Sequence, residues 1–419
     1  MKTRLQDRIL AHVLTLALFA AATVFAPSTA QAQTFKVLYS FTGRADGGNS
    51  YAGLVFDPAG NLYGTTYGGG DGGCFDGCGS VFELSPGSNG WTESTLLTFT
   101  GGSDGGDPFD RLILDAAGNL YGTAQVGGIP CEPFGCGVAF ELSPDPGGWK
   151  ESVLFEFPGE TGGYYPSTSL VFDKHGNLYS TLHDGGVYYG GAVYELTQGT
   201  GGWQQKILYS SGDEPSAPVI FDAAGNIYST TPFGGSHNCG VVFELLNGSW
   251  KEKTLYEFTG LSGCRPLGGL VFDKARNLYG MTDFGGKYDM GAVFKLAPSK
   301  GGKWKETVLH SFKGGSDGDL PGYSIPVFDR AGNLYGTTRA GGSSACNGYG
   351  CGTVFKLRPG KGGLWKKTTL HRFAGGSNGV GPVSGVIVDA AGNLYGTTVD
   401  GGNAGCGNFG CGVVFEITP

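Results

Sequence analysis

The chain has 419 residues, which is enough for one large all-β domain or for two domains of average size. Its 81 glycines follow no triplet period, which excludes collagen, and a hydrophobic fraction of 40% excludes a disordered chain. The net charge of −8 is unfavourable for binding nucleic acid, so we expect no nucleic-acid partner.

The first 32 residues have the features of a signal peptide. A basic start (Lys2, Arg4, Arg8) precedes an apolar run at 9–25, and Ala30–Ala32 supplies small residues for cleavage. A membrane anchor is the alternative, although the run is short for a spanning helix. Cleavage removes three positive charges and one negative charge, which changes the net charge from −8 to −10. We expect a secreted or periplasmic protein with no membrane span after removal of the signal.

The eight-residue word AGNLYGTT occurs three times, at Ala59–Thr66, Ala331–Thr338 and Ala391–Thr398. It belongs to a longer repeat with seven copies, whose shared asparagines lie 49 to 60 residues apart. These asparagines are Asn61, Asn119, Asn177, Asn226, Asn277, Asn333 and Asn393. Each copy continues into a run similar to VFEL, and six copies then carry a tryptophan and a further apolar run.

Each copy predicts four short strands, which we name a, b, c and d in chain order. Strand a is the GLVFD run, strand b is NLYGTT, strand c is VFEL, and strand d begins near the tryptophan. The Asp-x-x-Gly-Asn stretch is typical of a tight turn, because Asp accepts backbone hydrogen bonds while Gly and Asn tolerate positive φ. Four antiparallel strands in about 55 residues are typical of a β-propeller blade. A β-helix is the alternative, but its coils are shorter.

The seventh copy lacks strand d, and the start of the mature chain supplies one. Phe35–Gly48 matches the strand d segments Leu96–Gly106 and Ser152–Phe157. The sequence therefore predicts an all-β, seven-bladed β-propeller over 33–419, closed by the N-terminal strand pairing into the last blade. The predicted blades cover 49–99, 107–157, 165–211, 216–258, 266–312, 322–373, and 382–419 together with 33–41.

The pattern GNLYGTT…GG…G-x-VFEL resembles the GloVer-type tandem repeat of secreted bacterial proteins. The resemblance covers essentially the whole mature chain. It implies an exported protein of a family without an established enzymatic activity. Members often carry a C-terminal surface anchor, whereas this chain ends at Pro419 within the seventh copy, so we expect a released protein.

Ten cysteines fall in the loops. Four pairs lie between strands b and c: Cys74/Cys78, Cys131/Cys136, Cys346/Cys351 and Cys406/Cys411. Cys239 lies in the same loop of the fourth copy, and Cys264 in the connector that leaves that copy. An even number of cysteines in an exported chain predicts five disulfides, with about 2 kcal/mol of stabilisation from each short loop. Metal binding by paired thiolates is the alternative, and it lacks a supporting histidine pattern.

The two rims of a propeller differ in this sequence. The a–b and c–d turns, named here the hairpin rim, are short and uniform. The b–c loops and d–a connectors, named here the loop face, are long and variable, so we expect function at the loop face. A dipeptide between GTT and the following GG differs in every copy, and its predicted ring surrounds the mouth of the axial channel. We expect a ligand site formed by Tyr67, Gln125, His183, Asp184, Asp283, Arg339 and Asp400. Ordinary loop variation is the alternative.

Three further features carry weaker hypotheses. The connectors with Asp104/Asp107 and Asp317/Asp319 could bind calcium, and an ordinary Asp-Gly turn is the alternative. Apart from calcium we expect no cofactor. The pairs Tyr164-Tyr165 and Tyr188-Tyr189 suit stacking on sugar rings or packing over a loop. Six lysines gather on the hairpin rim of the fifth and sixth copies, where they either face solvent or bind an anionic partner. They are Lys300, Lys303, Lys305, Lys361, Lys366 and Lys367.

We expect a monomeric, non-catalytic binding or scaffold protein with a glycan or protein ligand. The chain contains no H-E-x-x-H motif, and we expect no G-x-S-x-G nucleophile elbow. The alternative is a hydrolase or lyase for a carbohydrate or lactone, with His183 and Asp184, Asp283 or Asp400 as acid and base. His237 is a second candidate histidine. Propellers host both kinds of function, so the fold does not decide between them.

Overall fold

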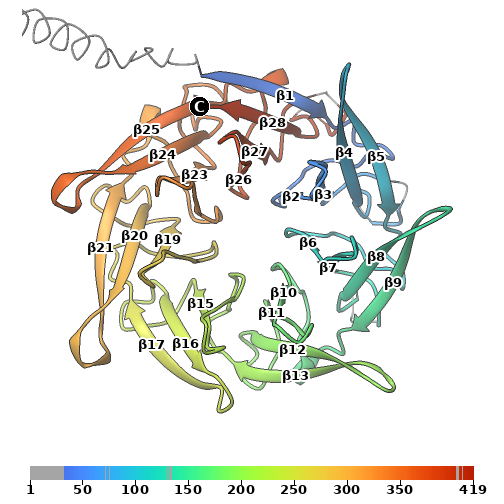
Figure 1. Cartoon of the computed structure of the whole chain (residues 1–419), viewed down its shortest axis with the longest axis horizontal. Coiled ribbons are helices and arrows are strands. Elements are labelled where there is room, and N and C mark those ends of the chain that lie inside the picture. Colours follow the sequence, from blue (N-terminus) through green and yellow to red (C-terminus); the bar gives the residue numbers. More distant parts are fainter. Residues whose placement is uncertain are drawn as a thin grey trace, which may run out of the picture.

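The computed structural model describes residues 33–70, 72–74, 76–129, 131, 135–402, 405–407 and 409–419. The predicted signal peptide over 1–32 lies outside the described residues. Seven sheets of four antiparallel strands surround a central axis (Figure 1). Within each sheet the strands pair in the order a, b, c, d, which confirms the predicted seven-bladed β-propeller.

The strands repeat with similar bounds in every blade. Strand a is β2 (Val55–Phe56), β6 (Ile113–Leu114), β10 (Val171–Phe172), β14 (Ile220–Phe221), β18 (Val271–Phe272), β22 (Val327–Phe328) and β26 (Val386–Val388). Strand b is β3 (Leu62–Thr66), β7 (Leu120–Ala124), β11 (Leu178–Leu182), β15 (Ile227–Thr231), β19 (Leu278–Thr282), β23 (Leu334–Thr338) and β27 (Leu394–Thr397).

The two outer strands of each blade are longer. Strand c is β4 (Ser80–Gly87), β8 (Val138–Asp145), β12 (Ala192–Gly199), β16 (Val241–Leu246), β20 (Ala292–Pro298), β24 (Thr353–Pro359) and β28 (Val413–Thr418). Strand d is β5 (Gly90–Thr98), β9 (Gly148–Glu156), β13 (Gly202–Ser210), β17 (Lys251–Glu257), β21 (Trp304–Ser311), β25 (Trp365–Arg372) and β1 (Thr34–Ser40). Single 3₁₀ turns occur at η1 (Glu160–Gly162), η2 (Lys300–Gly302), η3 (Gly315–Asp317), η4 (Lys361–Gly363) and η5 (Gly376–Asn378). Blades 1 to 6 follow chain order from β2–β5 to β22–β25, and blade 7 contains β26–β28 and β1.

The ring closes through β1, as predicted. β1 pairs antiparallel with β28, from Thr34 opposite Thr418 to Ser40 opposite Val413 (Figure 1). It therefore takes the place of strand d in blade 7. The next residue, Phe41, is fully buried, and its ring meets Phe82 of blade 1 edge-on at 5.0 Å.

The a–b turn has the side-chain chemistry that its sequence predicts. Asp57 accepts hydrogen bonds from the backbone nitrogen and the side-chain amide of Asn61, both at 2.8 Å. The Tyr63 hydroxyl donates to the same carboxylate at 3.4 Å. Equivalent contacts occur in the other six blades. The repeated Asp and Asn therefore close turns, which explains why every copy retains them.

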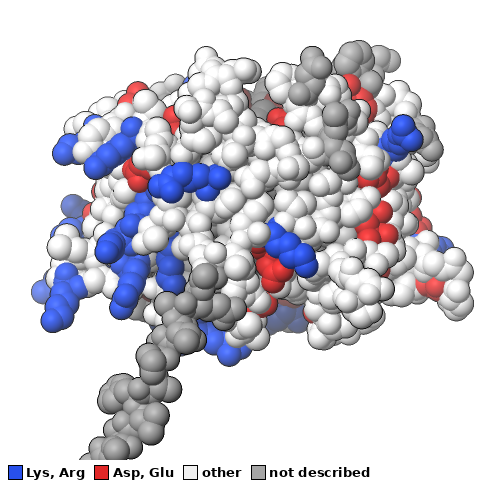
Figure 2. All heavy atoms as spheres, turned by 90° about the horizontal axis from the view of Figure 1, so that it is seen from above, with Lys and Arg blue, Asp and Glu red and all other residues white. Residues whose placement is uncertain are grey.

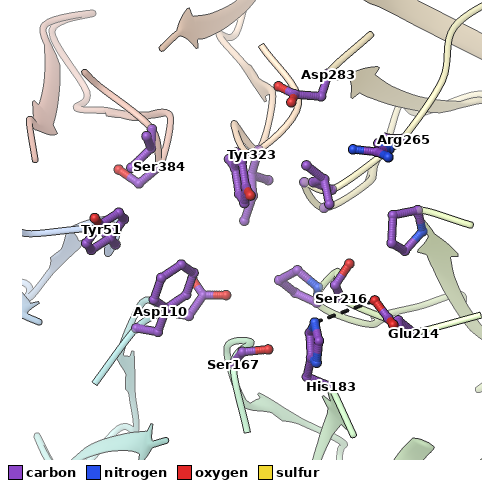
Figure 3. A pocket seen from close by; sticks show the side chains of 18 of the residues that line it. Tyr51, Asp110, Ser167, His183, Glu214, Ser216, Arg265, Asp283, Tyr323 and Ser384 are labelled. Carbon is purple, nitrogen blue, oxygen red and sulfur yellow. Dashed lines mark ion pairs between the residues drawn. The ribbon is translucent and has the colours of Figure 1, made fainter. Parts of the chain in front are cut away.

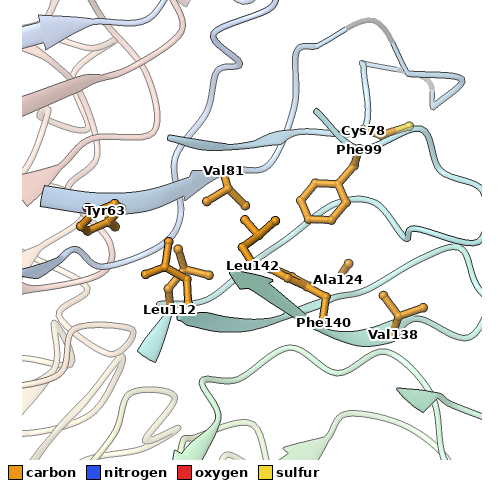
Figure 4. Close-up of a cluster of buried hydrophobic side chains, with 10 residues drawn as sticks. Tyr63, Cys78, Val81, Phe99, Leu112, Ala124, Val138, Phe140 and Leu142 are labelled. Carbon is orange, nitrogen blue, oxygen red and sulfur yellow. The ribbon is translucent and has the colours of Figure 1, made fainter. Parts of the chain in front are cut away.

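The core lies between neighbouring blades rather than at one centre. Tyr63, Val81 and Phe99 of blade 1 pack against Phe140 and Leu142 of blade 2 (Figure 4). Such packing buries apolar side chains on both sides of each sheet and leaves the axis open.

The glycine in strand b is required by an aromatic ring of strand c. Gly64 lies opposite Phe82, and a Cβ atom on Gly64 would lie 2.6 Å from the Phe82 ring. The aromatic ring of strand c therefore occupies the space above the glycine. Gly280 and Phe294 have the same arrangement in blade 5.

All five disulfides join the predicted cysteine pairs. Four close short b–c loops, and the fifth links the b–c loop of blade 4 (Cys239) to the next connector (Cys264). Within the part of the chain that the structure describes, no helix has the length and apolar character needed to cross a membrane.

The cysteines lie in the predicted loops, but they are not equally exposed. The second cysteine of each short pair is fully buried, with no exposed area: Cys78, Cys136, Cys351 and Cys411. Each lies two residues before strand c, so its side chain already reaches the core between two blades. Cys78 packs with Phe99, and Cys411 packs with Phe41.

This burial changes the role of the short disulfides. Cys136 and Cys351 likewise belong to hydrophobic clusters, whereas their partners Cys131 and Cys346 are only partly buried at the edge of the same clusters. Each bond therefore ties the loop to the core as well as closing it. The four buried sulfurs are inaccessible to a ligand, so they contribute to structure and not to a binding surface.

Candidate functional site

The loop face contains a cavity on the propeller axis, with a volume of about 580 Å³. Residues from all seven blades line it, mostly from the segment that leads into strand a and from the end of strand b. Figure 3 shows these side chains pointing inward around the axis. A second chamber of about 230 Å³ follows toward the hairpin rim, and the two share Asp110, Ile325 and Ser384.

The structure brings the predicted dipeptide ring to this mouth, but only part of it lines the cavity. Four of the seven predicted side chains line it: Gln125, His183, Asp283 and Arg339. Tyr67 lines a neighbouring cavity of about 890 Å³, and its ring contacts Tyr51 edge-on at 5.5 Å. Asp184 contacts His183 from outside the cavity, and Asp400 accepts a hydrogen bond from Asn49 at 3.1 Å.

A second ring of residues comes from the d–a connectors. This ring was not predicted from the sequence as part of the site. Two of its members, Glu214 and Arg265, line the cavity. At one equivalent position the backbone has positive φ in all seven blades, a conformation that is unfavourable for residues other than glycine, and six blades carry a residue other than glycine there. These residues are Asn49, Asp107, Tyr165, Glu214, Arg265 and Leu320. Proline follows five of them, so a variable residue before a constant proline is the signal that could have found them.

Two backbone hydrogen bonds hold four of these residues in place, namely Asn49, Asp107, Tyr165 and Arg265. The Arg265 nitrogen donates to the Cys239 carbonyl of blade 4 at 2.9 Å, and the Asp283 nitrogen donates to the Arg265 carbonyl at 2.9 Å. The connector is thereby fixed between the preceding b–c loop and the dipeptide of its own blade. Such a frame holds variable side chains at constant positions around the axis.

One side of the cavity carries an acid–base group. His183 lies between two carboxylates, and its Nδ1 is 2.9 Å from Asp184 Oδ2. Its Nε2 is 3.7 Å from Glu214 Oε2, the pair marked in Figure 3. The side chain of His183 remains 42% exposed. Nearby, Asp110 accepts a hydrogen bond from the Ser169 nitrogen at 2.8 Å, and burial raises the pKa of Asp110. His237 contacts Ser236 and does not line the cavity.

Blades 5 and 6 contribute two guanidinium groups to the cavity. Arg265 lies between the rings of Phe233 and Phe284, at 5.2 Å and 5.5 Å from their centres. Arg339 lies 3.8 Å from Asp283, whose side chain is only 4% exposed. Burial raises the pKa of Asp283, whereas the charge of Arg339 lowers it. Within the described residues Arg265 forms no ion pair, so its charge is available to a ligand.

An aromatic wall completes the cavity. The Tyr51 and Phe109 rings stack at 5.0 Å with an interplanar angle of 18°. Tyr51 lies across the cavity from Arg265 (Figure 3). Hydroxyl groups of Ser167, Ser216 and Ser384 also line it. Among the described residues, the Ser216 hydroxyl has no hydrogen-bond partner.

Two of the four calcium candidates, Asp104 and Asp317, have other partners. Asp104 accepts a hydrogen bond from the Thr100 nitrogen at 2.7 Å, which closes its own connector. Asp317 lies 3.0 Å from both His310 and Lys367. No cluster of three or more His, Cys, Asp or Glu among the described residues has the arrangement of a metal site. Of the paired tyrosines, Tyr164 and Tyr165 contact each other at 5.0 Å, whereas Tyr188 is 69% exposed.

The letters G-x-S-x-G do occur in the chain, at Gly101–Gly105, Gly314–Gly318 and Gly375–Gly379. A nucleophile elbow places its serine between a strand and an α-helix. These three stretches lie in d–a connectors, where the second and third form the 3₁₀ turns η3 and η5 and lead into the next strand a. The pattern therefore closes connectors here and does not form an elbow.

The fold and the site define a tandem-repeat β-propeller with a cavity on its axis. The chain belongs to the Gloeobacter/Verrucomicrobia repeat family, whose model matches residues 19–217, 131–348 and 214–419. This confirms the resemblance drawn from the repeated word.

Several solved structures resemble the chain at low identity. The extracellular domain of a protein described as a one-component system from B. thetaiotaomicron has a TM-score of 0.54 and 11% identity, with 91% of this chain and 39% of that chain covered. A gluconolactonase from Xanthomonas campestris has a TM-score of 0.40 and 14% identity, with 72% and 82% covered. A chain of a nidogen/laminin complex has a TM-score of 0.40 and 16% identity, with 67% and 86% covered. No curated protein matches the chain.

Proposed function

We propose that the chain is an exported binding protein that takes a saccharide in its axial cavity. The observation that carries the proposal is the stacked pair Tyr51 and Phe109, which faces charged and hydroxyl groups across the cavity. A sugar ring has an apolar face and an equatorial belt of hydroxyls, so it needs both kinds of wall. The volume of about 580 Å³ lies within the range of small-ligand sites.

The disulfides support export, because such bonds persist in oxidising compartments. A non-catalytic role agrees with the sequence, which contains no H-E-x-x-H motif. The aromatic anchors and the guanidinium of Arg265 support a polyhydroxylated ligand with an acidic group directed at that guanidinium. A protein ligand is the other expected partner, and it is an outcome of the test below.

The first test is a glycan array followed by calorimetry on residues 33–419. We expect a saccharide to bind, and Tyr51→Ala or Phe109→Ala to weaken binding at least tenfold, because truncation removes the stacking surface. Tyr188→Ala is the matched control, since Tyr188 lies on the same face outside the cavity and is 69% exposed. Equal weakening by all three variants, or no saccharide binding, would contradict the proposal and favour a protein ligand.

Hydrolysis or elimination on a carbohydrate or lactone is the second candidate function. The arrangement of His183 between Asp184 and Glu214 favours it, because one carboxylate can orient the imidazole while the other exchanges a proton with it. In this case His183→Gln abolishes turnover of a sugar lactone while affinity changes less than about threefold. Turnover that persists in His183→Gln rules out this histidine as the base.

A further inference from the structure

Charge is distributed unevenly around the ring. Residues 295–372, from β20 to β25, contain thirteen of the 28 basic residues but only four of the 36 acidic ones. The local excess is nine positive charges in a chain whose net charge is −8. Figure 2 shows Lys and Arg gathered on one side of the disc, with Asp and Glu more frequent on the other. The c–d hairpins of blades 5 and 6 are named here the basic sector.

The repeats themselves show that the scaffold does not require these charges. One position in strand c, opposite the tyrosine of strand b, is glutamate in five blades: Glu83, Glu141, Glu195, Glu244 and Glu416. In blades 5 and 6 the same position is Lys295 and Lys356. The Tyr228 hydroxyl donates to Glu244 at 2.7 Å, whereas the Lys356 ammonium lies 5.1 Å from the centre of the Tyr335 ring.

The hairpin turns of these two blades share a second feature. In blade 1 a two-residue turn joins Gly87 to Gly90. In blades 5 and 6 the strands are joined through η2 and η4, and each of these 3₁₀ turns begins with a lysine, Lys300 or Lys361. Neighbouring blades thus present the same longer, basic loop on the hairpin rim.

The outer strands hold like charges together without compensation. Arg358 of β24 lies directly opposite Lys366 of β25. Like charges at such a position destabilise a sheet. The equivalent pair is Ser85 and Thr92 in blade 1. Within the described residues neither Arg358 nor Lys366 forms an ion pair, so neutralisation must come from outside the protein or from salt.

We propose that the basic sector binds a linear anionic polysaccharide. The cations cover two adjacent hairpin tips and the outer strands behind them, which form a curved wall that a flexible chain can follow. A flat membrane would meet only the tips. Repeated carboxylates or sulfates, spaced along a sugar chain, would meet several ammonium groups at once, each pair contributing little alone. The sector lies on the hairpin rim, so this polymer and a ligand of the axial cavity bind independently.

The test uses heparin and polygalacturonate as probes, with binding measured by calorimetry in about 50 mM and about 300 mM salt. We expect binding to both polymers at low salt and at least tenfold weaker binding at high salt, because salt screens exposed charges. The variant K300E/K303E/K361E/K366E should weaken binding at least tenfold. A matched control, K150E/K174E/K206E/K251E, makes the same change in net charge on blades 2 to 4 and should weaken it less than threefold.

A second variant guards against misfolding. K295E/K356E restores the glutamate that five other blades use at this position, so it should keep the parent stability while weakening polymer binding about threefold or more. Equal losses in the sector variant and the matched control would overturn the proposal in favour of net charge alone. Binding to anionic phospholipid vesicles without binding to either polysaccharide would overturn it in favour of a membrane surface. No binding to any of these probes at low salt would also overturn it.

Discussion

At pH 8.5 the double variant Glu151→Gln, Glu306→Gln is expected to be more stable than the parent protein by about 4 kcal/mol, a figure already reduced for solvent screening of these half-buried groups. Glu151 lies in β9 and Glu306 in β21. One carboxylate oxygen of each is buried without a hydrogen-bond partner among the described residues. Burial raises the pKa of each side chain to about 7, and Asp104 adds to the effect at Glu151.

The sign of the pH dependence follows from the raised pKa. Below pH 4.5 both carboxyls are protonated in the folded and unfolded chains, and the contribution to stability is complete. Between pH 4.5 and about 7 the unfolded chain ionises first, so stability falls as the pH rises and the contribution is lost above the folded pKa. Glutamine does not ionise, so the advantage of the variant should be small at pH 4.5 and largest at pH 8.5.

Blade 3 already contains the proposed residue. Gln205 occupies the equivalent position, and its amide donates to the Gly162 carbonyl at 2.9 Å. Urea unfolding at pH 4.5 and pH 8.5, followed by tryptophan fluorescence, measures the difference. Gln205→Glu is the reverse control and should lower stability at pH 8.5. A variant advantage that is the same at both pH values would show that ionisation is not its cause.

Phe41→Ala is expected to lower the free energy of unfolding by about 4 kcal/mol, because it leaves a cavity at the joint between the last and first blades. Phe41 is fully buried and contacts Phe82 at 5.0 Å. Its backbone nitrogen donates to the Gly412 carbonyl at 3.1 Å. The side chain therefore anchors the closing strand to both neighbouring blades.

Phe99 is a control within the same chain. It is also fully buried, contacts Phe140 edge-on at 5.2 Å, and follows a strand d that is continuous with its own blade. Urea unfolding should give similar losses for Phe41→Ala and Phe99→Ala if β1 stabilises the ring as an ordinary strand d. A loss below about 1 kcal/mol for Phe41→Ala alone would mean that the ring is stable without the closing strand.

The fold could be predicted almost completely because one structural problem is solved seven times. The Asp57–Asn61 turn and the missing strand d of the last copy were both visible in the residue pattern. The cause of the small residue in strand b was not visible, because it depends on where the Phe82 ring lies over Gly64. The burial of Cys78 was hidden for the same reason, since its spacing reveals the bond but not the core beneath it. The sequence pattern therefore shows where such residues lie, but their role depends on side-chain packing in the folded chain.

The candidate site could be predicted only in part, for a related reason. The variable dipeptide lies between two sequence motifs that recur in every copy, so His183 and Arg339 could be placed near the axis. The direction of a side chain does not follow from its position, and Asp400 accordingly contacts Asn49 instead of lining the cavity. Glu214 and Arg265 come from connectors of variable length, and their orientation depends on a positive φ that the sequence does not display.

The antiparallel pairing of β1 with β28 has a mechanical consequence. Thr34 and Thr418 lie opposite each other, so both ends of the propeller leave it at one end of the same strand pair, on the hairpin rim. A force that pulls these two ends apart loads the hydrogen bonds of that pair one after another rather than all together. The ring should therefore peel open from blade 7 at low force, while a pull between two positions on the outer strands of different blades would meet a much stiffer molecule.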